Sequence, residues 1–297
     1  MIRHVIVDFG TISYWKLFSL VSKGKGYDDT TKNIFLIQES EDEFPNWCNV
    51  VDSEIVNIIN RFNPDKLTIA CDGRYLWRAK FYPKYKANRK KQRAEIPIDW
   101  DLFGKIKDRH VKELSKLLPV KAVLLDGIEA DDIIAVLTKR LHEEEEIIAV
   151  TGDGDINQLF RFNNFSVYDP KNNNHIKTMD WLDVLNVKVL SGDHGDNIDA
   201  LRPRLGPATA RKIINECGGD LHSYCVENNL IEQLTLNQKL INFEMIPTDI
   251  QDYIYSEYKD AKIIKPNHEK LALNFSGDYS TILDLFNKKL FKNALML

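Results

Sequence analysis

Short apolar runs alternate with helical patterns along the first half of the chain. Each run is rich in β-branched and other apolar residues, and the runs are residues 1–8, 67–72, 122–125 and 147–151. Continuous apolar runs of this length are typical of parallel strands that are buried on both faces of a sheet. Between them, apolar residues recur at helical spacing in segments 53–62 and 101–118. The pattern predicts an α/β fold with a mostly parallel central sheet and flanking helices.

The pattern changes after about residue 185, where strand signals fade and short helical patterns follow, separated by Gly-Pro and Gly-Gly pairs. We therefore predict an α/β domain over residues 1–185 and a smaller helical lobe over residues 186–297. No stretch approaches the roughly 18 apolar residues of a membrane span, and the N-terminus shows no signal-peptide pattern. We expect a cytoplasmic protein that binds no membrane. The four cysteines form no C-x-x-C pair, so neither a disulfide scaffold nor a zinc site is indicated.

Acidic residues stand at the ends of the predicted strands. Asp8 and Asp72 end the first two runs, and Asp153 and Asp155 follow the run 147–151. The carboxyl ends of parallel strands meet at one edge of the sheet, so we expect these four side chains to converge. Five more acids stand at predicted helix starts, namely Glu129, Asp131, Asp132, Asp193 and Asp196.

Nine converging carboxylates cannot all be ionised at neutral pH without cations between them. Oxygen ligands without His or Cys suit Mg²⁺, for which Mn²⁺ can substitute. Nine acids are too many for one Mg²⁺ and imply two or more ions, which cleave phosphodiesters by in-line displacement when they lie about 4 Å apart. The alternative is that each acid caps a helix or turn, the simpler interpretation for any single one. The recurrence of strand-end acids favours the metal site.

One segment concentrates positive charge. Residues 74–93 hold nine basic side chains and no acid, although the 297-residue chain has 40 Lys+Arg, 44 Asp+Glu and a net charge of −4. Subtracting these nine charges leaves −13 on the remaining residues, so the segment predicts a local polyanion site. Its cations can neutralise phosphates, and its aromatic rings can stack on unpaired bases. The alternative is a charged helix face whose aromatic residues, such as Trp77 and Phe81, belong to the core.

Five motifs, in this order and spacing over residues 1–210, resemble the 5′-nuclease or flap endonuclease family, relatives of the 5′-nuclease domain of DNA polymerase I. They are most similar to the T-even phage ribonuclease H branch. The motifs are Ile6-Val-Asp8-Phe, Tyr82-Pro-Lys-Tyr-Lys-Ala-Asn-Arg89, Glu129-Ala-Asp-Asp132, Thr151-Gly-Asp-Gly-Asp155-Ile-Asn-Gln-Leu and Gly192-Asp-His-Gly-Asp-Asn-Ile198. The resemblance implies a PIN-like nuclease domain with a helical arch over about residues 74–110, followed by a helical DNA-binding lobe.

The resemblance also implies roles for individual residues. The first metal region would consist of Asp8, Asp72, Glu129, Asp131, Asp153 and Asp155. The second would be completed by Asp132, Asp193 and Asp196, with Asp155 near both. The catalytic residues would be Asp8, Asp72, Asp153 and Asp155, with Lys86 or Arg89 facing the scissile phosphate. Because residues 74–93 contain no acid, we expect Lys86 and Arg89 to lack local partners and to be free for phosphate.

Further basic residues are expected to contact nucleic acid. Where the family often has a Gly-x-Gly hairpin followed by Lys, this chain has Arg204 in place of the first Gly and Ala208 in place of the Lys. Point-charge contacts with phosphate would then replace backbone contacts. The expected nucleic-acid-binding residues are Arg78, Lys84, Tyr85, Lys86, Arg89, Lys90, Arg202, Arg204, Arg211 and Lys212. The segment 282–286 is interpreted as part of an amphipathic closing helix in preference to a sliding-clamp peptide.

The resulting hypothesis is a monomeric 5′–3′ exonuclease and flap endonuclease with ribonuclease H-type activity. It would hydrolyse RNA or DNA at 5′ ends or flaps, including RNA–DNA hybrids, and remove RNA primers during replication in the cytoplasm, the host's if the protein belongs to a phage. A single-strand-binding protein or sliding clamp would be a replication partner. One alternative is a Mg²⁺-dependent phosphatase on small phosphoesters, which leaves residues 74–93 without a purpose. Another is a non-catalytic branched-DNA-binding protein, in which some metal carboxylates should have been lost.

Overall fold

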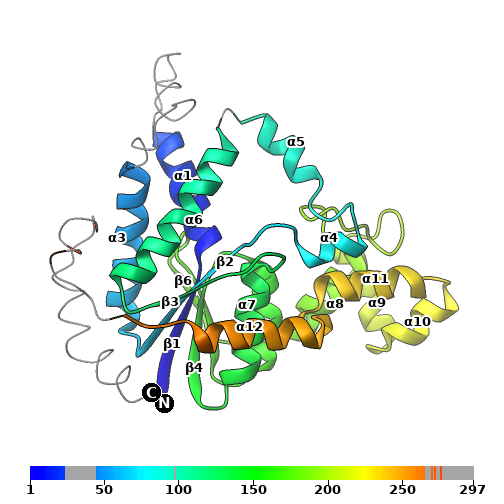
Figure 1. Ribbon diagram of the computed structural model, residues 1–297. Coiled ribbons are helices and arrows are strands. Elements are labelled where there is room, and N and C mark those ends of the chain that lie inside the picture. The colour runs from blue at the N-terminus through cyan, green and yellow to red at the C-terminus, as the bar shows by residue number, and fades with distance from the viewer. Residues whose placement is uncertain (24–44, 97, 265–268, 270, 272–274, 276–297) are drawn as a thin grey trace.

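The computed structural model describes residues 1–23, 45–96, 98–264, 269, 271 and 275 (Figure 1). The strands are β1 (Ile2–Asp8), β2 (Lys66–Cys71), β3 (Lys121–Leu124), β4 (Glu145–Val150), β5 (Phe165–Asp169) and β6 (Asn174–Ile176). The helices before β4 are α1 (Phe9–Lys23), α3 (Pro45–Phe62), α4 (Trp77–Phe81), α5 (Asn88–Ala94), α6 (Trp100–Leu117) and α7 (Ala130–Leu141). Those after β4 are the 3-10 helix η2 (Gly154–Arg161), α8 (Trp181–Ser191), α9 (Pro207–Glu216), α10 (Leu221–Glu227), α11 (Ile231–Ile241), the 3-10 helix η3 (Phe243–Met245) and α12 (Thr248–Asp260).

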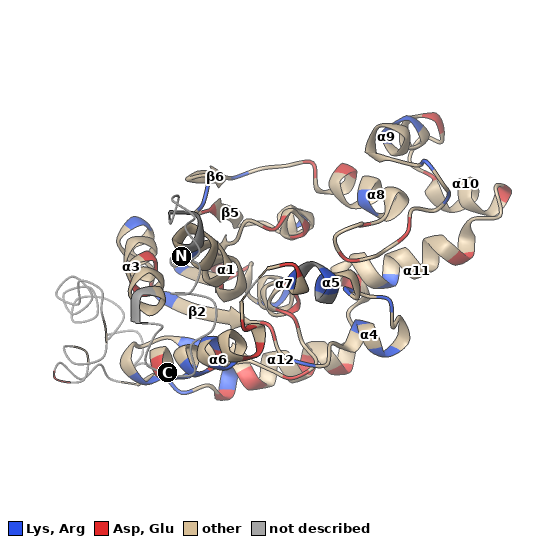
Figure 2. Ribbon diagram, turned by 90° about the horizontal axis from the view of Figure 1, so that it is seen from above, with Lys and Arg blue, Asp and Glu red and all other residues tan. Residues whose placement is uncertain are grey.

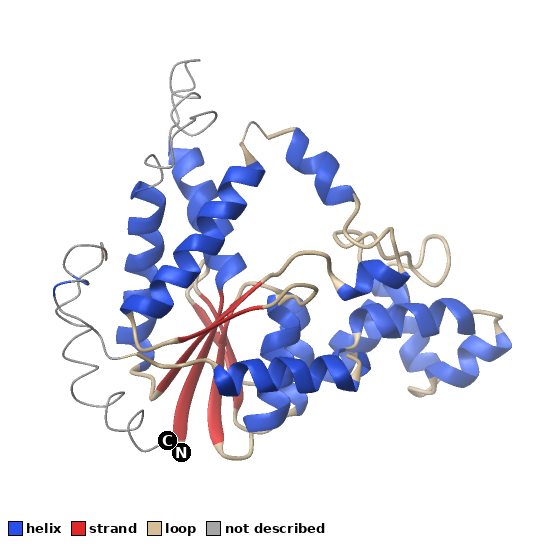
Figure 3. Ribbon diagram, in the orientation of Figure 1, coloured by secondary structure: helices blue, strands red, loops and turns tan. Residues whose placement is uncertain are grey.

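The described strands form one six-stranded sheet in the order β3-β2-β1-β4-β5-β6 (Figure 3). Strands β1 to β5 run parallel, whereas β6 pairs antiparallel with β5. From β1 the chain adds β2 and β3 on one side, and it then continues with β4 on the other side of β1. The strand order therefore reverses between β1 and β4, and such a switch point opens a crevice at the carboxyl ends of the strands.

Helices cover both faces of the sheet. Along β1, Val5 and Val7 belong to the core formed with α1, α3 and α6, whereas Ile6 belongs to the core formed with α7 and α12. The alternation follows from the two-residue period of a strand. All three side chains are fully buried, and burying such a side chain contributes about 1.5–3 kcal/mol. Packing on both faces thus fixes β1, and with it the position of Asp8 at its end.

Two further parts lie beyond the sheet. In Figure 1, α4 lies to the right of the carboxyl ends of the strands and α5 lies above them, and the chain then leads into α6, which descends beside the sheet. Helices α8 to α11 form a separate cluster, whose core includes Leu190, Leu205, Ile213 and Leu240. The chain then returns through α12, which contacts α7 and β3.

The predicted α/β fold with a mostly parallel sheet is confirmed. The four predicted strands correspond to β1 through β4, and the two predicted helical segments to α3 and α6. The domain boundary expected between residues 185 and 186 falls inside α8, and α12 packs on the sheet side. The segment 282–286 lies outside the described residues. None of the described helices has the length and apolar character needed to cross a membrane.

Candidate active site

Acidic side chains gather at the switch point of the sheet. Asp8 is the last residue of β1, Asp72 follows β2, and Asp153 lies three residues beyond the end of β4. Gly10 shows how closely the first two approach, because a Cβ atom at Gly10 would lie 3.1 Å from Asp8 Oδ1 and 3.4 Å from Asp72 Oδ2. The structure therefore brings the predicted strand-end acids together.

Asp8 is buried and is held by two threonines. The Thr151 hydroxyl donates to Asp8 Oδ2 at 2.8 Å, and the Thr11 backbone N–H donates to Asp8 Oδ1 at 3.1 Å. Burial, followed by the charge of Asp72, raises the pKa of Asp8 to about 6, although these hydrogen bonds oppose the shift. Asp8 thus lacks a nearby positive charge that would stabilise its ionised form.

Asp131 faces the same excess of negative charge. It stands in the first turn of α7, and burial together with the charges of Asp153 and Asp8 raises its pKa well above the ordinary value. Among the described residues, no ion pair reaches Asp8, Asp72, Asp131 or Asp153. Hard oxygen donors that repel one another in this way fit a divalent cation such as Mg²⁺.

A second acidic group consists of Asp155, Asp193 and Asp196. One carboxylate oxygen of each lies within 4.8 Å of the others. A tight loop presents Asp193 and Asp196: Gly192 has φ of +69°, and a Cβ there would lie 2.4 Å from the Ile198 carbonyl oxygen, so only glycine fits. We refer to this trio as the second region, and to Asp8, Asp72, Asp131 and Asp153 as the first region. Asp131, Asp155, Asp196 and Glu129 also line one small cavity of about 10 Å³, so the two regions meet.

Two of the nine acids have partners that make them structural in this conformation. Asp132 is fully buried, accepts a hydrogen bond from Trp77 Nε1 at 2.9 Å and pairs with Arg78 at 2.8 Å. Glu129 pairs with Arg78 at 2.8 Å and accepts from Tyr85 Oη at 3.0 Å. It also pairs with Lys86. In this structure the carboxylate of Asp132, predicted for the second metal region, neutralises Arg78 inside the protein.

Two residues predicted to contact nucleic acid, Arg78 and Tyr85, are instead engaged inside the protein. Arg78 is only 2% exposed and binds Glu129, Asp132 and the backbone oxygen of Leu240, so it cannot reach phosphate. Tyr85 is buried, and its hydroxyl group donates to Glu129, so its ring is not free for a base. Lys86 does have local carboxylate partners, because the chain folds acids from distant segments against it.

Arg89 is also engaged by an acid. Its guanidinium pairs with Asp196 Oδ1 at 2.7 Å, and Lys86 Nζ lies 3.6 Å from Asp196 Oδ2. Backbone contacts reinforce this junction, because Lys86 N–H donates to the Asp196 carbonyl at 2.9 Å and Asn88 Nδ2 donates to the His194 carbonyl at 2.9 Å. Figure 2, which is seen from above, shows α5 coloured largely blue for its basic residues. The expectation that Lys86 and Arg89 lack partners is wrong.

The remaining predicted cations lie on the surface. Lys84, Arg202, Arg204, Arg211 and Lys212 are exposed. Arg211 pairs with Asp183 at 3.2 Å and Lys212 with Glu216 at 3.7 Å, whereas Arg202 and Arg204 make no ion pair with any residue that the structure describes. The side chain of Lys90 lies outside the described part of the chain.

Sequence reasoning missed three residues that contact these acids. Thr11 and Thr151 hold Asp8, and the only signal was their position near strand ends, Thr11 three residues after β1 and Thr151 directly after β4. Lys188 on α8 pairs with Asp193 Oδ2 at 2.8 Å and also with Asp155. No local pattern around Lys188 sets it apart from a surface lysine.

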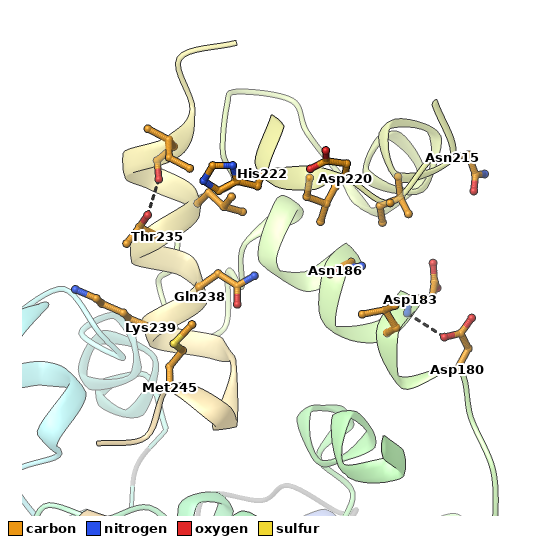
Figure 4. A pocket seen from close by; sticks show the side chains of 16 residues that line it. Asp180, Asp183, Asn186, Asn215, Asp220, His222, Thr235, Gln238, Lys239 and Met245 are labelled. Carbon is orange, nitrogen blue, oxygen red and sulfur yellow. Dashed lines mark hydrogen bonds between the residues drawn. The ribbon is translucent and has the colours of Figure 1, made fainter. Parts of the chain in front are cut away.

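A separate pocket lies in the helical cluster. It has a volume of about 720 Å³ and lies between α8, α10 and α11. Figure 4 shows Thr235, Gln238 and Lys239 on one wall facing Asn186 and Asp183 on the other. Two other acids of its lining, at positions 180 and 220, accept backbone hydrogen bonds as the N-caps of α8 and α10. None of the nine predicted metal ligands lines this pocket, so it is distinct from the acidic site.

Comparisons of the sequence with known proteins agree on one family. Residues 32–188 match the family model of the 5′-3′ exonuclease N-terminal resolvase-like domain. Ribonuclease H of Enterobacteria phage T4 is 28% identical over 207 residues, which cover 63% of this chain and 67% of that protein. The 5′-3′ exonuclease of Buchnera aphidicola subsp. Acyrthosiphon pisum is 31% identical over 208 residues, covering 64% of this chain and 67% of that protein. The 5′-3′ exonuclease of Mycoplasmopsis pulmonis is 26% identical, and the match spans about half of its length, 54%.

Solved structures agree in fold. The T5 D15 protein co-crystallised with metal ions superposes with a TM-score of 0.66 at 18% identity, covering 87% of this chain and 98% of that one. The catalytic core of Rad2 in complex with a DNA substrate gives a TM-score of 0.50 at 15% identity, covering 97% of this chain and 87% of that one. At these identities the likeness establishes the shared architecture of sheet, overlying helices and helical cluster.

Proposed function

Because the chain belongs to the 5′-3′ exonuclease family, a family of enzymes, we propose that it is a metal-dependent 5′–3′ exonuclease and flap endonuclease. The observation that carries the proposal is the convergence of seven carboxylates at the sheet's switch point, in two groups that suit divalent cations. The first region would hold one Mg²⁺ ion through Asp8, Asp72, Asp131 and Asp153. The second region would hold another through its three aspartates, with Asp155 between the two.

The bound ions would supply an activated water and stabilise the leaving 3′ oxygen, which divides a phosphodiester into a 5′-phosphate and a 3′-hydroxyl. The protein's own contribution is to hold the carboxylates in place. Thr11 and Thr151 orient Asp8, and the backbone N–H of Ala130 donates to Asp72 Oδ1 at 2.9 Å. The hydrogen bonds from Thr11 and Thr151 favour the ionised form of Asp8, which can bind a cation.

The cations beside the second region would receive the nucleic acid. Lys86 and Arg89 stand next to Asp196, so a phosphate bound between the ions would lie within their reach. There they would offset the charge that the phosphate gains in the transition state. The exposed Lys84, Arg202, Arg204, Arg211 and Lys212 would contact the flanking phosphates of DNA or of an RNA–DNA hybrid.

RNA primer removal during replication is the biological role that we propose. It is supported by the likeness to a phage protein named ribonuclease H and to bacterial proteins named 5′-3′ exonuclease. The protein would work in the cytoplasm as a monomer, alongside replication proteins such as a single-strand-binding protein or a sliding clamp.

Cleavage of defined substrates tests the proposal. A 5′-labelled DNA flap and a 5′-labelled RNA–DNA hybrid are incubated with the protein in Mg²⁺ and in EDTA. We expect short 5′-phosphorylated products from both substrates in Mg²⁺ and none in EDTA. Asp153→Asn should remove cleavage while leaving flap affinity within a few-fold, since it removes a metal ligand and no phosphate contact. Hydrolysis of small phosphomonoesters without flap cleavage would replace the proposal with a phosphatase.

A further inference from the structure

The second region contains a lysine from the helical cluster. Lys188 lies in the last turn of α8, and its ammonium bridges Asp193 Oδ2 at 2.8 Å and Asp155. The side chain is 25% exposed, so most of it is packed inside the site. These contacts place a positive charge between two of the three carboxylates that would hold a divalent ion.

The third carboxylate of the second region is neutralised in the same way. Asp196 pairs with Arg89 at 2.7 Å and lies 3.6 Å from Lys86 Nζ. Every carboxylate of this region therefore has a cation of the chain beside it. The first region differs, because no ion pair among the described residues reaches its four aspartates, whereas Lys188 and Arg89 pair with the carboxylates of the second region.

We propose that Lys188 is a resident counter-cation of the second region, and that its ammonium and a divalent ion exclude one another between Asp155 and Asp193. The inference rests on the proposed function, because it concerns the same carboxylates. An ammonium and a divalent cation repel each other strongly at contact distance, and each needs the same carboxylate oxygens. A divalent ion can enter only when Lys188 moves away.

Two consequences follow for the order of events. The metal-free protein stays neutralised at Asp155 and Asp193, so the loop Gly192–Asn197 can keep its fold before any ion binds. Divalent ions should occupy the uncompensated first region at lower concentration than the second, where they must displace Lys188. Lys188 is thus a positioning residue that sets when the second region fills.

Calorimetric titration of the metal-free protein with Ca²⁺ tests this inference without reference to cleavage. The unmodified chain should show two classes of site. In Lys188→Met the weaker class should bind about tenfold more tightly or better, because the competing charge is gone, while the tighter class is unchanged. Lys116→Met is the matched control, since it removes a lysine from an exposed ion pair with Glu113 on α6. It should leave both classes unchanged.

A second measurement covers the case in which Lys188→Met fails to fold. Acetylation of Lys188 by acetic anhydride in the unmodified protein, read by mass spectrometry, should rise several-fold when Ca²⁺ is added, because the ammonium leaves its ion pairs. Equal or weaker Ca²⁺ binding by Lys188→Met, or unchanged acetylation, would overturn the inference and leave the proposed nuclease function standing. Two occupied sites without flap cleavage in Mg²⁺ would instead count against the proposed function alone.

Discussion

Hydroxyl groups decide how readily Asp8 can bind a cation. Its carboxylate is buried beside Asp72, which raises its pKa to about 6, and the hydroxyl of Thr151 opposes that shift. A hydrogen bond to a charged group is worth about 1.5–3 kcal/mol. In the proposed metal site, Thr151 would therefore act as a positioning residue for the Asp8 carboxylate.

Replacing Thr151 by Val should raise the Mg²⁺ concentration needed for half-maximal flap cleavage by about tenfold or more, as expected from losing a hydrogen bond of this strength. Because the pKa of Asp8 would rise further, this increase in the Mg²⁺ requirement should be larger at pH 6 than at pH 8. The Mg²⁺ concentration that gives half-maximal flap cleavage measures the effect. Thr138→Val is the matched control, because the buried Thr138 hydroxyl has no hydrogen-bond partner in the described structure. Identical Mg²⁺ dependence in both variants would contradict this role of Thr151.

At the same scale, the sequence predicts which acids converge but not which cations meet them. Asp8, Asp72 and Asp153 follow from their positions at strand ends, since parallel strands bring such ends together. Lys188, by contrast, reaches Asp155 only because α8 packs against η2, and the sequence gives no local sign of that contact. The pairing of Asp132 with Arg78 was likewise not predictable, because the two residues are distant in the sequence and meet only inside the fold.

Among the elements, α4, α7 and α11 are joined by one buried guanidinium. Arg78 of α4 pairs with Glu129 and Asp132 at the start of α7, and its Nε atom donates to the Leu240 carbonyl of α11 at 2.9 Å. The ring of Trp77 lies 4.4 Å from its guanidinium carbon. Arg78 therefore links α4 to both the sheet domain, through α7, and the helical cluster, through α11.

Arg78→Leu should lower the free energy of unfolding by about 3–5 kcal/mol, because it leaves two buried carboxylates without their charge partner. Urea denaturation followed by circular dichroism measures this loss. Arg74→Leu removes an arginine that is 60% exposed and pairs with Asp108, so it should cost less than about 1 kcal/mol. Similar costs for the two variants would show that Arg78 is not a buried junction in solution.

A histidine–aspartate pair joins α3 to α6. Burial alone lowers the pKa of His110, but hydrogen bonds with Asp52, at 2.8 Å, and Cys48 outweigh it and raise the pKa to about 9. The folded pKa lies above the unfolded value near 6.5, so the stabilisation is complete below pH 6.5 and is lost as the pH rises through 9. We expect on the order of 2 kcal/mol of unfolding free energy to disappear between pH 6 and pH 10. Urea denaturation should show a smaller pH dependence in Asp52→Asn, and an equal dependence would exclude the pair as its source.

Hydrophobic periodicity predicted the elements that carry long apolar runs, β1 to β4, α3 and α6. It did not predict β5 and β6, because both are short and carry polar residues, Ser166 and Asp169 in β5 and Asn174 and His175 in the edge strand β6. The junction of α5 with the loop Gly192–Asn197 was also beyond prediction. It depends on contacts such as Asn197 Nδ2 with the Lys84 carbonyl, which join residues 113 positions apart.

Over the whole molecule, the basic residues near the acidic site fall into two sets, which we call the inner ring and the outer ring. An inner ring of buried or half-buried cations, made of Arg78, Lys86, Arg89 and Lys188, is already paired with carboxylates. Exposed cations of the overlying segment and the helical cluster, such as Lys84, Arg202 and Arg204, lie outside it. The inner ring should therefore govern metal binding and cleavage, whereas the outer ring should govern the capture of nucleic acid.

Replacing Arg202 and Arg204 together by Ala should change binding and leave folding intact. Both side chains are exposed and make no ion pair within the described structure, so their loss should cost little stability. If each contacts one phosphate of the duplex, the log–log slope of flap affinity against salt should flatten by about 1.8, or about 0.9 for each contact. Ca²⁺ permits the measurement, because its looser geometry should allow binding without hydrolysis.

The matched control removes the same charge elsewhere. Lys116 and Lys171 are also exposed, and neither lies in the basic segment 74–93 or in the loop before α9. Replacing both by Ala changes the net charge equally but should leave the slope unchanged, because counterion release requires contact with phosphate. Single-turnover cleavage at saturating protein should be nearly normal in both double variants, since neither touches the inner ring. An equal slope for the two double variants would mean that duplex phosphates do not contact Arg202 and Arg204. The capture of nucleic acid would then have to rest on exposed cations of the basic segment 74–93, such as Lys84.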